Sequence, residues 1–173
     1  MVAFPLFFHP ILKNMPKVNL SKYTIKEFEP VYKREVQKLI QQVLKKIGIE
    51  SDAGQPSQDK DLENIPIIYR GKGRFWICLN NAGKVIGTVA IKNKDKGIAK
   101  LKRMFVLPRF HGTGVGQKLL DHAVAFAKKQ GFKEINLNTH LLMRRAHHFY
   151  AKNGFKKIRE GEKYLAYKKK LIH

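Results

Sequence analysis

The stretch that decides the fold is residues 101–120, LKRMFVLPRFHGTGVGQKLL. It begins with an apolar run typical of a strand, meets a proline, and passes through three glycines in five positions into a segment typical of an amphipathic helix. Glycines let a backbone approach a ligand closely, and the unpaired N–H groups of a first helical turn favour negative charge. The pattern therefore predicts an anion-binding loop. A turn that only packs a strand against a helix is the alternative.

Two better-known phosphate loops do not fit this segment. A Walker A loop ends in Gly-Lys followed by Ser or Thr, whereas Gly116 is followed by Gln117, Lys118 and Leu119. The dinucleotide fingerprint needs G-x-G-x-x-G and an acidic residue at the end of the next strand, whereas this loop is G-x-G-x-G and Glu134 opens the next predicted strand. The sequence therefore argues against a P-loop nucleotide site and against a nicotinamide cofactor.

Hydrophobic periodicity outside this segment predicts a mixed α/β sheet protein. Residues 80–83, NNAG, suit a hairpin, so the front half of the sheet is expected to be antiparallel. Residues 51–60 carry one apolar side chain and are predicted to form a loop that borders a substrate site. Strands are predicted at 23–28, 74–79, 85–91, 98–106, 134–138, 155–158 and 164–168, helices at 30–47, 116–130 and 144–153, and a helical turn near Leu62.

The chain is strongly basic, and the charge is uneven. Its 173 residues suit one compact domain, and the formal net charge is +22 at 43% hydrophobic content, which argues against disorder. Residues 87–173 carry 21 of the 35 basic and 5 of the 13 acidic residues, a net charge of +16. Such a field attracts a phosphate-bearing cofactor, an acidic protein segment or nucleic acid, and repels polycations. A lysine-rich solvated surface is the alternative.

Residues 1–14 form an apolar N-terminal extension, and residues 15–173 are predicted to form the single domain. The extension is too short for a membrane span and, with two prolines and no basic start, unlike a signal peptide, so no membrane partner is expected. The single cysteine, Cys78, excludes an internal disulfide and a cysteine zinc site and favours a reducing, cytoplasmic location. His147 and His148 are neighbours on a predicted helix and point about 100° apart, so no metal site is predicted.

Two motifs in this order resemble the GNAT superfamily of acetyl-CoA-dependent N-acetyltransferases. Arg109, Gly112 and Gly114 match its pyrophosphate signature, which is Arg or Gln, two residues, Gly, one residue, and Gly or Ala. Residues 146–155, AHHFYAKNGF, resemble its A-x-x-x-Y-x-x-x-G-F passage. By order of elements the resemblance covers residues 23–168. It implies an α/β (α+β) fold with a mixed, mostly antiparallel central sheet flanked by helices and splayed to form an acetyl-CoA cleft.

The resemblance also implies where acetyl-CoA would bind. Backbone groups of residues 104–106 would hold the pantetheine arm as an added strand does. The loop amides and Arg109 would hold the pyrophosphate, and Asn138 and Tyr150 would face the thioester. The implied cofactor-binding residues are Met104, Phe105, Val106, Arg109, Phe110, His111, Gly112, Thr113, Gly114, Val115, Gly116, Asn138 and Tyr150.

Tyr150 and His140 are the predicted catalytic residues. A phenol with a pKa of about 10 can protonate a departing thiolate without being ionised at neutral pH, so Tyr150 is the predicted general acid; a packing role is the alternative. Many relatives carry a base Glu on the strand before the loop, but residues 98–103 contain no carboxylate. His140, just after the strand that contains Asn138, is the predicted replacement, and an exposed loop histidine is the alternative.

The sequence thus predicts an N-acetyltransferase that moves an acetyl group from acetyl-CoA to a primary amine by direct transfer in a ternary complex. Because of the basic field, we expect an acceptor amine that also bears negative charge. The alternative is a non-catalytic acyl-CoA or anion-binding module, or a nucleic-acid-associated acetyltransferase-like domain. Nucleic acid is the less favoured partner because no recognition motif is present. A homodimer is left open.

Overall fold

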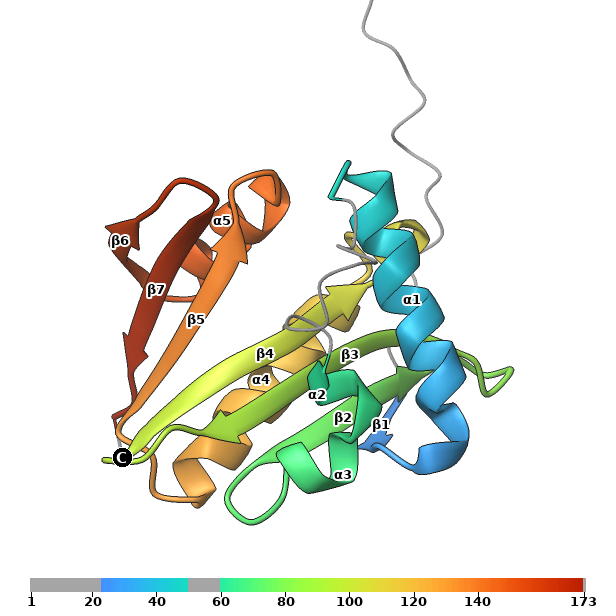
Figure 1. Cartoon of the computed structure of the whole chain (residues 1–173), viewed down its shortest axis with the longest axis horizontal. Helices are drawn as coiled ribbons and strands as arrows, with labels where there is room; N and C mark the ends of the chain where they lie inside the picture. Colours follow the sequence, from blue (N-terminus) through green and yellow to red (C-terminus); the bar gives the residue numbers. More distant parts are fainter. Residues whose placement is uncertain (1–22, 50–59, 173) are drawn as a thin grey trace, which may run out of the picture.

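One seven-stranded mixed sheet organises residues 23–49 and 60–172, which are the residues that the computed structural model describes (Figure 1). The strand order is β1-β2-β3-β4-β5-β7-β6. The strands are β1 (Thr24–Glu27), β2 (Arg74–Leu79), β3 (Val85–Asn93), β4 (Ile98–Val106), β5 (Glu134–His140), β6 (Lys156–Glu160) and β7 (Tyr164–Lys170). The helices are α1 (Lys33–Lys46), α2 (Lys60–Glu63), α3 (Ile65–Ile68), α4 (Val115–Lys129) and α5 (Arg144–Lys152).

The predicted fold class is confirmed, because only β4 and β5 pair in parallel and every other neighbouring pair is antiparallel. The β2–β3 hairpin forms at the predicted NNAG turn, where Gly83 has a φ of 69° and the Asn80 side chain accepts from the Lys84 amide at 3.0 Å. The proposed extension 1–14 and nearly all of the proposed loop 51–60 lie outside the described residues, and the domain start at residue 15 does so too.

The helices cover both faces of the sheet because each carries one apolar stripe. Buried α1 residues lie against β3 and β4, and buried α4 residues lie against the same strands from the other side. Tyr69, which follows α3, contacts Phe75 at 5.4 Å between ring centroids, whereas Trp76 contacts Phe126 of α4 at 4.8 Å. Successive strand residues point to opposite faces, so these contacts define a front face with α1, α2 and α3 and a back face with α4 and α5.

Two short helices occupy the region for which the sequence predicted only a turn near Leu62. Leu62 of α2 and Ile65 of α3 are buried in the core. Pro66 lies in the first turn of α3, where an amide N–H would have no partner within the helix, so proline is tolerated there. A helix of four residues is too short to show a helical period, so no pattern in the sequence predicted α3.

Candidate active site

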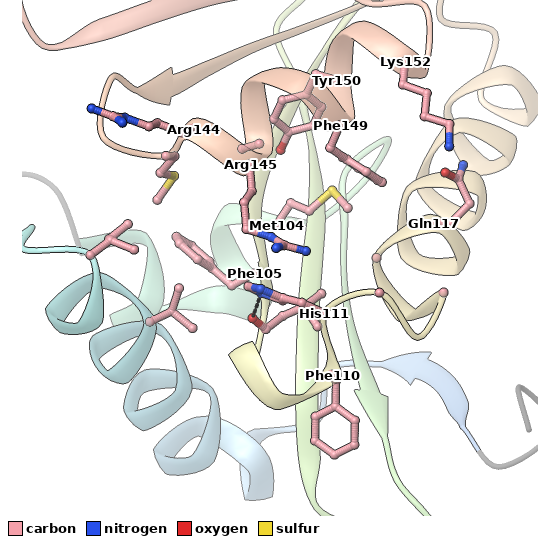
Figure 2. Close-up of a pocket in the computed structure, with 18 of the residues that line it drawn as sticks. Met104, Phe105, Phe110, His111, Gln117, Arg144, Arg145, Phe149, Tyr150 and Lys152 are labelled. Carbon is pink, nitrogen blue, oxygen red and sulfur yellow. Dashed lines mark hydrogen bonds between the residues drawn. The ribbon is translucent and has the colours of Figure 1, made fainter. Parts of the chain in front are cut away.

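The site is built on a fork between β4 and β5. The two strands pair only from Ile98 to Lys100, opposite Glu134 to Asn136, and then separate towards their carboxyl ends (Figure 1). A cleft of about 500 Å³ lies at the open end of the fork, between β4, the loop after it, α5 and α1 (Figure 2). The cleft crosses the sheet, because Val43 and Ile47 of the front-face helix α1 line it together with Phe149 of the back-face helix α5. The lining of the cleft therefore comes from both faces of the sheet.

A bulge in β4 turns the strand towards the cleft. The register with β3 shifts between Thr88 and Ala90, and opposite this shift Arg103 has a φ of 52°. The Thr88 hydroxyl donates to the Arg103 carbonyl at 2.6 Å. Bulges bend and twist a strand and are frequent beside active sites. Residues 104–106 therefore leave the bulge along the cleft wall.

A buried carboxylate secures this bulge from the front face. Asp61 of α2, 8% exposed, accepts two hydrogen bonds from the Arg103 guanidinium, one of them at 3.0 Å, and one from the Tyr69 hydroxyl. The ammonium of Lys102 lies 3.4 Å away. Burial alone would raise the pKa of Asp61, but the hydrogen bonds from Arg103 and Tyr69 and the two positive charges outweigh it and hold the pKa at about 2.

The backbone of β4 offers polar groups to the cleft. The Leu107 amide donates to Ile86 of β3 at 3.0 Å, so by strand alternation the backbone groups of Val106 and Met104 point away from β3 and into the fork. The side chain of His111 already uses one of them, because its Nε2 donates to the Val106 carbonyl at 3.0 Å (Figure 2). The sequence had indicated only the main chain of His111.

The glycine loop presents a smaller set of amides than expected. Phe110, His111 and Thr113 donate their amides to carbonyls within the loop at 2.8, 3.1 and 3.4 Å. Among the described residues, no partner is found for the amides of Gly112, Gly114, Val115, Gly116 and Gln117. These amides lie at the start of α4, where Gly114 has a φ of 88°. Thr113 and Arg109 do not line the cleft, and the Arg109 guanidinium lies over the Phe110 ring at 5.1 Å.

Tyr150 combines a packed ring with a hydroxyl that points into the cleft (Figure 2). The residue is 7% exposed, and its ring lies 5.5 Å from the ring of Phe155. Burial raises the pKa of Tyr150 above its ordinary value, so the hydroxyl stays protonated at neutral pH. The hydroxyl makes no hydrogen bond to the residues that the structure describes. It is therefore a donor directed at whatever occupies the cleft.

Asn138 and His140 lie on the front face of β5 and do not line the cleft. Asn138 Oδ1 accepts from Lys100 Nζ at 2.8 Å. His140 Nδ1 accepts from the Leu142 amide at 3.2 Å, so the neutral ring carries its proton on Nε2 and has no free lone pair. Burial, and then the charge of Lys163, lowers the pKa of His140. To act as a base in this conformation the ring would have to release Leu142, so its predicted role stays a prediction.

Several cleft residues were missed by the sequence analysis. Arg144, Arg145 and Lys152 of α5 line the cleft and place cations around it (Figure 2). Arg144 and Arg145 directly precede the recognised Tyr150 motif and Lys152 lies inside it, and that proximity was the available signal. The described lining residues include no aspartate or glutamate.

Other kinds of site are not supported by the described residues. No group of three or more His, Cys, Asp or Glu residues is arranged to hold a metal ion in residues 23–49 and 60–172. None of the helices in this part of the chain is long and apolar enough to cross a membrane. Cys78 is a buried core residue, and this burial raises the pKa of its thiol to about 11.

Comparisons with known proteins agree on one family. The model of the acetyltransferase (GNAT) family matches residues 37–155. The uncharacterized N-acetyltransferase YjgM of Escherichia coli K12 is 27% identical over 126 residues, which cover 71% of this chain and 75% of YjgM. The N-acetylaspartate synthetase of Danio rerio is 31% identical over 91 residues, which cover 52% of this chain but only 32% of that protein.

Solved structures share the fold over nearly their whole length. A GNAT-family acetyltransferase from Staphylococcus aureus Mu50 superposes with a TM-score of 0.81 at 30% identity, covering 87% of this chain and 99% of that one. The PaiA N-acetyltransferase of Thermoplasma acidophilum, solved in complex with coenzyme A, has a TM-score of 0.70 at 20% identity and covers 86% and 99%.

Proposed function

Since the chain belongs to the acetyltransferase (GNAT) family, we propose that it transfers an acetyl group from acetyl-CoA to a primary amine, directly and in a ternary complex. The observation that carries the proposal is the composition of the cleft at the β4–β5 fork. Its walls combine unpaired amides of the glycine loop, the free backbone edge of β4 and the Tyr150 hydroxyl. Its lining comes from helices on both faces of the sheet, which supports the binding of two substrates at once.

The residues of the cleft fit coenzyme A. A Cβ at Gly116 would lie at ordinary van der Waals distance from two lining side chains, 3.8 Å from Val106 and 3.9 Å from Phe149, and glycine leaves that space free. The unpaired amides of Gly112, Gly114, Gly116 and Gln117 and the cations of Arg145 and Lys152 suit a diphosphate, whereas the buried Val115 does not line the cleft. When bound there, acetyl-CoA supplies an activated acetyl thioester. The coenzyme A complex of the Thermoplasma acidophilum protein, which shares this fold, supports the choice of cofactor.

The pantetheine arm is proposed to lie along residues 104–106 and to hydrogen-bond the backbone of Met104 and Val106. The His111 imidazole competes for the Val106 carbonyl and has to release it if the arm uses that group. The amides of Phe110, His111 and Thr113 are engaged within the loop, so they are not proposed as phosphate ligands.

Tyr150 is the proposed general acid. When the amine attacks the thioester, the sulfur leaves as a thiolate that requires a proton. The Tyr150 hydroxyl holds that proton at neutral pH and points to the interior of the cleft. Its packed ring fixes the direction of donation at little further loss of conformational entropy.

The attacking amine has to lose a proton, and the described lining residues include no carboxylate that could act as the base. We propose that water in the cleft removes it, with His140 as the alternative base from the front face. Because the cleft carries cations, and because the chain has a net charge of +22, the acceptor is proposed to bear negative charge. The Danio rerio relative is named for the acetylated form of aspartate, an amine of this charge class.

The test is acceptor-dependent release of free coenzyme A by the wild type, Tyr150→Phe and His140→Gln. We expect Tyr150→Phe to lower kcat by about 10²-fold or more and to leave acetyl-CoA affinity unchanged. Tyr32→Phe removes a hydroxyl outside the cleft and is the matched control. An unchanged kcat in Tyr150→Phe would show that Tyr150 is not the general acid. A fall in kcat of comparable size in His140→Gln would identify His140 as the general base.

A second candidate is a module that binds acyl-CoA without turnover. The absence of a carboxylate among the described residues of the cleft wall favours it. Stabilisation of the fold by acetyl-CoA, together with no acceptor-dependent thiol release from any amine tested, would select this alternative.

A further inference from the structure

Within residues 23–49 and 60–172, no helix covers the front face of β5 and β7, unlike the front face of β2 to β4 (Figure 1). In the middle of this bare surface, Asn138 of β5 stands opposite Ala166 of β7, and Ala166 stands opposite Arg159 of β6. Residues directly opposite in antiparallel strands share a face. The three residues therefore form one row, with the small Ala166 between two longer polar side chains. We call this row the Ala166 trough.

Lys100 reaches the same trough from β4. It stands opposite Asn136, but its ammonium donates to Asn138 Oδ1 at 2.8 Å, so the side chain leans two residues towards the cleft. The amide oxygen of Asn138 is thereby used as the acceptor, which leaves its NH₂ group to donate. Among the described residues, neither this NH₂ group nor the Arg159 guanidinium has a hydrogen-bond partner.

Positive charge gathers at the trough, and the described residues supply no matching anion. Burial, and then the charges of Lys94, Lys102 and Arg159, lowers the pKa of Lys100 to about 8. The nearby acids in the described part of the chain are already paired. Asp61 is held by Arg103 and Lys102, and Glu134 lies 3.7 Å from Lys168. An oxyanion in the trough would relieve this repulsion and would meet N–H donors on both sides.

We propose that the Ala166 trough binds an oxyanion, carboxylate or phosphate, of the acceptor. Lys100 and Asn138 form one side of the site and Arg159 the other. The assignment to the acceptor rests on the proposed acetyltransferase function, and anion binding itself does not. The trough lies on the front face, opposite to the glycine loop and α4, so it is separate from the proposed phosphate site of acetyl-CoA.

The reach from the trough to the cleft selects the kind of acceptor. Met104, in the cleft wall, is four residues beyond Lys100, or about 13 Å along the strand. The lysine side chain covers about 6 Å of this distance, so the oxyanion and the reacting amine are roughly 7 Å apart or more. An extended peptide rises about 3.4 Å per residue, which places the anionic group two or three residues from the amine. The acceptor is therefore a peptide amine close to acidic or phosphorylated residues.

Binding is tested first, without acetyl-CoA. The probe is the blocked peptide acetyl-Ala-Glu-Glu-Ala-amide, titrated by calorimetry against its Gln-Gln counterpart at constant ionic strength. Wild type should prefer the Glu-Glu peptide by about tenfold or more, and Arg159→Gln should lose the preference. Ala166→Leu should also lose it, because the larger side chain fills the trough without changing the charge. Lys128→Gln removes a cation from α4 on the back face and should keep the preference.

Kinetics then test the role in acceptor recognition, with unblocked Ala-Glu-Glu-Ala-amide and Ala-Gln-Gln-Ala-amide. In Arg159→Gln and Ala166→Leu we expect KM for the Glu-Glu peptide to rise about tenfold or more with kcat within about twofold, and no change for the Gln-Gln peptide. A phosphoserine and serine pair of the same length distinguishes phosphate from carboxylate recognition.

Each outcome decides between the two proposals. Equal binding of the two blocked peptides by wild type, or an unchanged preference in Ala166→Leu, overturns the trough. Binding that behaves as expected, with no coenzyme A released from any unblocked peptide, leaves the anion site standing and refutes the acetyltransferase proposal. Acetylation of glutamate in preference to the Glu-Glu peptide overturns the assignment of a peptide acceptor, because one amino acid does not span the distance.

Discussion

The Asp61–Arg103 pair is expected to contribute measurably to the stability of the fold. Asp61 forms an ion pair with Arg103, and both side chains are nearly inaccessible to solvent, 9% and 10% exposed. Asp61→Asn keeps the shape of the side chain and removes its charge. The substitution removes the negative charge that Asp61 places against the buried Arg103 guanidinium, at the bulge that turns β4 towards the cleft.

The size of the effect follows from proton linkage. The pKa of Asp61 falls from 3.8 in the unfolded chain to about 2 in the folded one. This difference corresponds to about 2 kcal/mol of folding free energy, and the loss of a buried partner raises the expected cost to about 2 to 4 kcal/mol. Because the folded pKa is the lower one, the contribution is fully present above about pH 4 and is lost as the pH falls through 2.

The assay is urea unfolding of wild type and Asp61→Asn at pH 7, 4 and 3. We expect the difference in unfolding free energy to be largest at pH 7 and to shrink at pH 3. The matched control is Asp95→Asn, at an exposed position with a φ of 70° that asparagine tolerates well. A loss below about 0.5 kcal/mol at pH 7, or one of equal size at pH 7 and pH 3, would refute the proposed role of the ion pair.

Three further substitutions test other parts of the site. Gly114→Val places a β-branched residue at a φ of 88° and should cost about 1 to 3 kcal/mol and abolish acetyl-CoA binding by calorimetry. Gly131→Val, at a φ of 77°, should lose similar stability but keep cofactor affinity, and equal loss of affinity in both would contradict the loop assignment. Lys100→Met should raise the free energy of unfolding at pH 7, because the pKa of about 8 lies below the unfolded value of 10.5 and the folded state therefore disfavours the charged form. The advantage should fade between pH 8 and pH 10.5 in urea titrations, and a destabilised variant at pH 7 would show that the ammonium is paired. His111→Ala should raise acetyl-CoA affinity by up to about tenfold, because the Val106 carbonyl is freed, whereas a fall in affinity would assign the imidazole to cofactor binding.

Much of this architecture could be predicted from local sequence pattern. The stripe of Val36, Leu39, Ile40 and Val43 and the glycine run before α4 carry periodic signals, and both elements formed where they were expected. The sequence predicted strand β5 over 134–138 only. In the structure β5 continues to His140, and because buried and polar residues alternate along it, Asn138 and His140 share a face. The sequence could not indicate that this face is the front one, because that depends on the order of strands in the sheet.

The parts that escaped prediction depend on contacts between distant residues. Arg103 and Asp61 are 42 positions apart, and no local period relates them. The engaged amides of Phe110, His111 and Thr113 depend on the conformation of the turn, which the glycine count does not specify. Val43 was expected in the core, yet it also lines the cleft, because the fork opens beneath the end of α1.

Lys100 shows how one position can serve function at the expense of stability. Three neighbouring cations and partial burial disfavour its charged form, and an apolar residue of similar length would pack there without that penalty. The same arrangement makes the trough a strong anion site, because a bound oxyanion offsets the repulsion between these cations. If Lys100→Met stabilises the fold and also loses the preference for acidic peptides, both effects have this one electrostatic cause. If it stabilises the fold and keeps the preference, the cations at this face are only a surface feature and the acceptor is recognised elsewhere.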